Sequence, residues 1–165
     1  MPACDRKADK ASIALKNMEI SADQEKLIGD ISETIIPKTT TPGAKDLSLH
    51  LFVLKMLDDC YKKEDQQAFI TGMGQFSDAV KAKYSKSFAD LDTKQREAML
   101  LSIEQDKDKK STANPKELKS FYGIVKDQTV NGYVNSKYFM TKQVVYELVP
   151  GRYNAYFPVK EAAAV

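Results

Sequence analysis

The chain has 165 residues, of which 42% are hydrophobic and 29% are charged; these proportions fit one soluble globular domain and exclude disorder over the whole length. Lys and Arg total 25 against 23 Asp and Glu, and the net charge of +2 gives no long-range field for gathering nucleic acid, so no nucleic-acid partner is expected. No apolar run approaches the roughly 18 residues of a membrane span, so we expect membrane contact only through a lipid anchor or a partner.

Residues 1–20 are mixed in charge and predict a flexible N-terminal tail. We expect this tail to follow an export signal that has been removed, because Cys4 stands where a lipoprotein carries its acylated cysteine. An ordinary frayed terminus is the alternative. Cys4 and Cys60 are the only cysteines, too few for a zinc site. A single disulfide between them is one interpretation, and a role of Cys60 as a small buried hydrophobic residue fits the sequence equally well.

Helical periodicity in residues 21–158 predicts an all-α fold, a single domain built as a compact bundle of about five to six helices. The first helix opens at the capping box Ser21–Gln24. It ends before Pro37, because the residue before a proline is pushed out of the α region. Asp46 is predicted to cap the second helix, which ends near Tyr61.

An ordered Pro-Gly loop joins these two helices, with Pro37, Thr41, Pro42 and Gly43 as its structural residues. The loop could contact a partner or brace the domain internally. Proline and glycine fix the shape of the backbone and supply little contact area, which favours the brace.

The third helix contains Gly72 and Gly74, which weaken its helix propensity and are expected to permit a close helix crossing. A second capping box, Asp92–Gln95, opens the fourth helix.

Asn114-Pro115 opens the fifth helix, which runs towards Tyr133. Beyond Ser136 we predict an irregular aromatic C-terminal segment, and residues 159–165 are predicted to form a disordered tail.

Few residues of the sequence are candidates for catalysis or for binding a cofactor or metal. His50 is the single histidine, and an imidazole within a helical pattern is more often a core or surface group than a metal ligand. Gly72-Met-Gly74 approaches a dinucleotide motif, but no strand is predicted before it. Adjacent carboxylates such as Asp58-Asp59 diverge by about 100° on a helix. The sequence therefore predicts no catalytic, cofactor-binding or metal-binding residue.

Four segments between residues 23 and 152 together resemble the small subunit (subunit 3) family of gluconate 2-dehydrogenase. The most specific is Ile35–Ala44, which is similar to that family's loop signature "iiP-x-T-x-x-PGA". The others are Phe88–Leu100, then Phe121 to Ser136 with Thr129 and Gly132-Tyr133, and finally Tyr146 with Pro150-Gly151.

The chain departs from the family in two places. Many members carry Tyr-Gly-Gly-Asn where this chain has Tyr138–Thr141, and many carry Trp at the position of Tyr146. If the glycine-rich turn touches the partner subunit, the partner here differs, and this departure bears on the identity of the substrate more than on membership of the family.

The resemblance implies a non-catalytic escort within a flavin-dependent sugar or sugar-acid dehydrogenase complex. Its partners would be a large flavoprotein of the glucose-methanol-choline type, which carries FAD, and a cytochrome c that takes the electrons. It also implies export, often by the twin-arginine route, to the periplasm or cell envelope. This chain would bind no cofactor itself.

Aromatic anchors suit the centre of such a subunit contact, and the candidates are Tyr133, Tyr138, Phe139, Tyr146 and Tyr153. Plain core packing is the other interpretation of these side chains. Two other functions stay open for the chain, a stand-alone helical envelope lipoprotein and an enzyme in its own right. The enzyme would need a pocket with converging polar groups, for which the sequence offers no set of residues.

Overall fold

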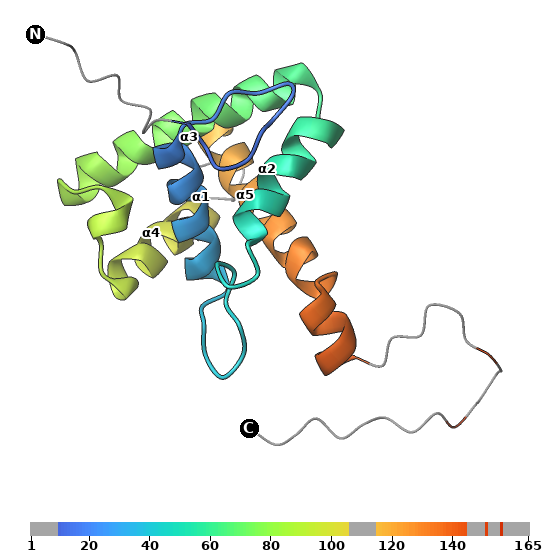
Figure 1. Cartoon of the computed structure of the whole chain (residues 1–165). Helices are drawn as coiled ribbons and strands as arrows, with labels where there is room; N and C mark the ends of the chain where they lie inside the picture. Colours follow the sequence, from blue (N-terminus) through green and yellow to red (C-terminus); the bar gives the residue numbers. More distant parts are fainter. Residues whose placement is uncertain (1–9, 106–114, 145–150, 152–155, 157–165) are drawn as a thin grey trace, which may run out of the picture.

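The computed structural model describes residues 10–105, 115–144, 151 and 156, and these residues form an all-α bundle (Figure 1). Within them the chain contains no strand, and one isolated bridge joins Lys10 to Ser21. The elements are α1 (Ala22–Ile35), α2 (Leu49–Cys60), α3 (Lys63–Tyr84), a short 3-10 helix η1 (Phe88–Asp90), α4 (Thr93–Gln105), α5 (Lys116–Val134) and a π-helix η2 (Phe139–Gln143). The predicted fold class is confirmed.

Helix α5 is the centre of the bundle and packs against α1, α2, α3 and α4. Its tightest partner is α3, and Phe121 of α5 lies between Phe69 and Phe76 of α3, with ring centroids 4.8 and 5.8 Å away. All three side chains are fully buried. Burial of each is worth about 3 kcal/mol of transfer free energy, so this contact carries much of the core.

Gly72 allows the close approach of α3 and α5. A Cβ atom at this position would lie 2.2 Å from the carbonyl oxygen of Glu117 and 2.7 Å from the Cβ of Phe121. The prediction of a close crossing is confirmed for Gly72. It is wrong for Gly74, where a Cβ would meet nothing within 4 Å.

Local sequence signals set most helix starts. Both capping boxes form: Ser21 accepts from the amide of Gln24, and Asp92 accepts from the amide of Gln95. Asp46 does not cap the second helix, because α2 begins two residues later with Ser48 as its N-cap in a left-handed conformation. The carboxylate of Asp46 instead accepts from the amide of Gly43 within the loop.

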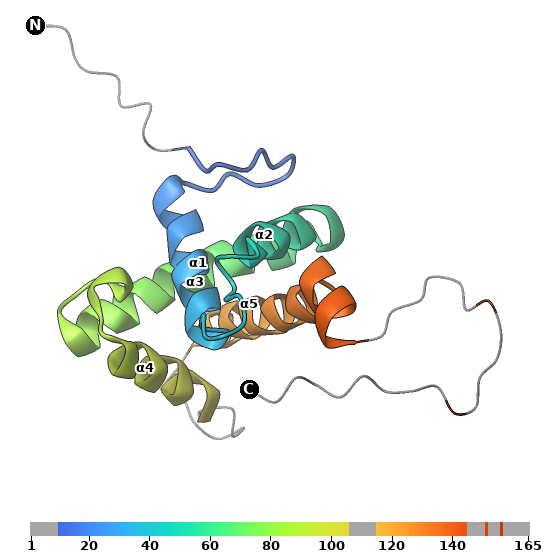
Figure 2. The same cartoon turned by 60° about the horizontal axis from the view of Figure 1, so that its bottom comes forward.

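Residues 10–20 form a strap, the name used below, that crosses from α1 to the C-terminal end of α2 (Figures 1 and 2). These residues were expected to belong to a tail, and that expectation is wrong for them. Met18 and Ile20 of the strap are buried in the core. The amides of Lys16 and Asn17 donate to the carboxylate of Asp58 over 2.8 and 2.7 Å.

The structure also bears on the predictions made for Cys60, for the C-terminal segment and for membrane spans. Cys60 is a free, exposed thiol at the end of α2 rather than a buried hydrophobe. Residues 139–143 of the predicted irregular segment form a π-helix. None of the described helices is long and apolar enough to cross a membrane.

Candidate functional site

The Pro-Gly loop is fixed to the end of α1 by one carboxylate. Glu33 accepts from the amide of Lys38 over 3.0 Å and from the amide of Lys45 over 2.7 Å, and so closes both ends of the loop. The amide of Ala44 donates to the carbonyl of Ile36 over 2.9 Å. These contacts make the loop an internal brace between α1 and α2.

Gly43 is required in this brace because the carboxylate of Glu33 lies against it. A Cβ atom at Gly43 would lie 2.5 Å from Oε1 of Glu33 and 2.6 Å from the amide nitrogen of Lys38. Pro42 and Thr41 are half-buried beside it, whereas Pro37 is exposed. The loop is therefore shaped by its contacts within the domain.

Two further residues of the family-like segments join helices at the same end of the bundle. The hydroxyls of Thr129 on α5 and Ser32 on α1 are 3.0 Å apart, and both side chains are fully buried. A Cβ atom at Gly132 would lie 2.8 Å from the Cδ1 atom of Phe52 on α2. The end of α5 is thus held against α1 and α2.

Beyond this brace, the end of α5 and η2 carry exposed apolar side chains. We call this surface the docking face and define it by Val130, Tyr133, Val134, Phe139 and Val144. Val130 is 43% exposed, Val134 37% and Val144 40%. Tyr133 and Phe139 are half-buried, with their ring centroids 5.7 Å apart.

The structure places three of the five predicted anchors. Tyr133 and Phe139 pack on one another, and the half-buried Tyr138 accepts from the side-chain amide of Gln143 over 3.0 Å. Tyr146 and Tyr153 lie outside the described residues, as does Cys4.

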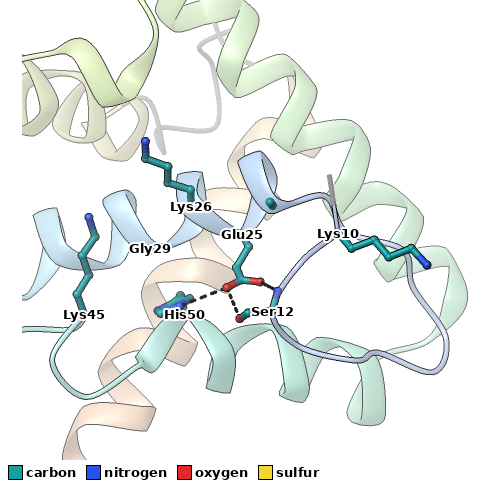
Figure 3. Close-up of a pocket in the computed structure, with 8 residues that line it drawn as sticks. Lys10, Ser12, Glu25, Lys26, Gly29, Lys45 and His50 are labelled. Carbon is teal, nitrogen blue, oxygen red and sulfur yellow. Dashed lines mark hydrogen bonds and ion pairs between the residues drawn. The ribbon is translucent and has the colours of Figure 1, made fainter. Parts of the chain in front are cut away.

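A pocket of about 410 Å³ lies beside α1, at the outer end of the strap (Figure 3). Glu25 of α1 is its central polar group. The Glu25 carboxylate accepts from both the amide and the hydroxyl of Ser12, each over 2.6 Å. On its other side, Nε2 of His50 lies 3.8 Å from Oε1 of Glu25. Sequence analysis missed this cluster because its members are far apart along the chain.

The imidazole of His50 is set in an environment that disfavours its charged form. Burial lowers its pKa below the ordinary 6.5, Glu25 acts in the opposite direction, and the ammonium of Lys45 lowers it further. Its Nδ1 atom is buried without a hydrogen-bond partner. The neutral tautomer with the proton on Nε2, facing Glu25, fits both observations.

Ser12, Glu25 and His50 do not form a nucleophile triad. In a triad the imidazole stands between hydroxyl and carboxylate and takes the hydroxyl proton. Here the carboxylate stands in the middle: it accepts from Ser12, and Nε2 of His50 lies 3.8 Å away, beyond hydrogen-bond distance. Among the described residues no group of three or more His, Cys, Asp or Glu side chains converges as a metal site. The cluster is therefore suited to holding the strap.

The family model described as gluconate 2-dehydrogenase subunit 3 matches residues 22–151 of the chain. This span includes the loop, His50 and all of α5, and it leaves out the strap. No curated protein and no solved structure matches the chain.

Proposed function

The chain belongs to the gluconate 2-dehydrogenase subunit 3 family, and from this premise we propose that it is the non-catalytic small subunit of a flavin-dependent gluconate or sugar dehydrogenase complex. In this role it binds the large flavoprotein subunit, stabilises it and is exported with it. The family match over residues 22–151 is the observation that carries the proposal. A family named as one subunit implies further subunits, and their identity is part of the proposal.

The docking face is the proposed contact with the large subunit. It combines exposed valines with the aromatic pair Tyr133 and Phe139, and aromatic side chains are enriched at the centres of protein interfaces. A stable interface buries about 800 Å² on each partner, more than these few side chains offer. We therefore expect Tyr146 and Tyr153 to join the contact.

FAD is proposed to be held by the large subunit, with a cytochrome c as the electron acceptor. Gly72 and Gly74 of this chain lie in the interior of α3 rather than in a strand-to-helix turn, so their amides do not form a pyrophosphate cradle. The contribution of this chain is contact area and fold stability.

The proposed location is the periplasm or the cell envelope. Acylation of Cys4 would provide a lipid anchor, and one acyl chain alone gives weak membrane binding. Contact with the membrane-attached complex would supply the second point of attachment.

Affinity purification of the full chain from its native envelope tests the proposal. We expect a large flavoprotein in near-equal amount, identified by mass spectrometry and by a flavin spectrum. A colourless monomer under gentle conditions would contradict the proposal and favour a stand-alone envelope module.

A variant with Val130→Asp and Val134→Asp tests the location of the contact. Both charges would be buried unpaired in the complex, so the flavoprotein yield should fall at least about tenfold. Leu101→Asp is the matched control, because Leu101 is 52% exposed on α4, away from the docking face. Equal loss in both variants would contradict the assigned face, as would no loss in either.

A further inference from the structure

The strap is held at two points by carboxylates of unequal exposure. At its inner end Asp58, which is 1% exposed, accepts from the amides of Lys16 and Asn17. At its outer end Glu25, whose side chain is 13% exposed, accepts from Ser12 beside the open pocket. The two ends can therefore respond differently to a change in the solvent.

One oxygen atom of Glu25 accepts from Ser12 and is also the carboxylate oxygen that faces His50. Oε1 of Glu25 lies 2.6 Å from the hydroxyl oxygen of Ser12 and 3.8 Å from Nε2 of His50 (Figure 3). A charge-assisted N–H···O bond is about 2.8 Å long. Protonated His50 would gain that bond only if the carboxylate moved about 1 Å towards it. That movement takes the oxygen away from Ser12.

The other charged groups around His50 do not compete for this carboxylate. The ammonium of Lys45, from the loop, is bound to Asp30 of α1. Lys26 of α1 and Lys10 of the strap also line the pocket, and their ammonium groups point away from Glu25 (Figure 3). Glu25 is thus the counter-charge that a protonated His50 meets first.

We propose that the outer end of the strap is a proton-sensitive latch: protonation of His50 draws the Glu25 carboxylate away from Ser12, and the Ser12 end opens while the Asp58 end stays closed. Opening enlarges the pocket and releases Ser12 from α1, while the backbone bond from the amide of Ala11 to the carbonyl of Ile20 and the bridge of Lys10 to Ser21 keep the two residues before it in place. The latch is independent of the proposed dehydrogenase partner, because all of its groups belong to this chain and the strap lies outside the family-matched span.

Amide hydrogen exchange of the full chain, measured by NMR on either side of the imidazole titration of His50, tests the latch; because the pKa of His50 is lowered from the ordinary 6.5, that titration is followed first and the lower pH is chosen below it. The protection factor of the Ser12 amide should fall roughly fivefold at the lower pH, the change that loss of one net hydrogen bond brings. The Asn17 amide is the internal control and should keep its protection. In His50→Gln, which keeps a side-chain N–H donor without a titrating group, the fall at Ser12 should vanish.

A second measurement tests the competition directly. The chain has a single histidine, so its imidazole titration is followed without ambiguity. Ser12→Ala removes the competing hydroxyl and should raise the pKa of His50, whereas Glu25→Gln should lower it. An unchanged titration in Ser12→Ala would overturn the proposal. In the exchange experiment, a constant protection factor at Ser12 would also overturn it, as would an equal fall in the protection factors of Ser12 and Asn17. A fall at Ser12 that persists in His50→Gln would overturn it as well.

Discussion

Substitution of Gly72 by alanine should destabilise the bundle, although alanine is the better helix former. The new Cβ would lie 2.2 Å from the carbonyl oxygen of Glu117, about 1 Å inside normal contact. Because the obstacle is backbone of α5, no side-chain rotation relieves it, and α3 and α5 must separate. Overpacking lowers the free energy of unfolding by up to about 3 kcal/mol, and the better helix propensity of alanine raises it by about 1 kcal/mol. We expect a net loss of about 2 kcal/mol in the free energy of unfolding.

Gly74→Ala is the matched control for this substitution. Gly74 lies two residues away on the same helix, and a Cβ there meets nothing within 4 Å, so only the propensity gain of about 1 kcal/mol applies. Urea unfolding followed by circular dichroism measures both variants. With a slope of about 2 kcal/mol per molar urea, Gly72→Ala should lower the midpoint by about 1 M and Gly74→Ala should raise it. If the two variants shift the midpoint in the same direction, the close-crossing argument is refuted.

Two further predictions concern the brace and the terminus. Thr129→Val should cost about 1 to 3 kcal/mol because it leaves the buried hydroxyl of Ser32 without its partner, and adding Ser32→Ala should recover part of that loss; additive losses in urea unfolding would contradict the pairing. Cys4→Ser should release the full-length precursor from the membrane fraction if Cys4 is acylated, and unchanged fractionation would refute the lipid anchor.

Local signals made the helices predictable, and contacts distant in sequence made the rest unpredictable. Capping boxes such as Ser21–Gln24 act within one turn, so the sequence reveals them. Asp46 carries the same chemistry, but its carboxylate serves the loop because Gly43 and Lys38 lie within reach in the folded chain. Gly72 and Gly74 look alike in sequence, and only the position of α5 separates their roles.

The candidate sites were predictable to different degrees for the same reason. The loop residues are contiguous, so their structural role could be predicted, whereas the carboxylate of Glu33 that closes the loop could not be assigned. The strap was expected to be part of a tail, because the contacts that order it are invisible in the local sequence. Its amides reach Asp58, which lies 41 and 42 residues away along the chain. His50 and Glu25 likewise meet only through the packing of α2 against α1.

The family-like residues share a location, and that location bears on where a partner would bind. The loop closed by Glu33, the contact of Thr129 with Ser32 and the contact of Gly132 with Phe52 all join α1, α2 and α5 near the end of α5. None of these side chains is a large exposed apolar group. Their physical effect is to fix the end of α5, which carries Val130, Tyr133 and Val134 of the docking face. A rigid apolar surface loses less conformational entropy on binding than a mobile one. We propose that the motif residues support the docking face from beneath, and that the sequence signature serves a subunit contact in this indirect way.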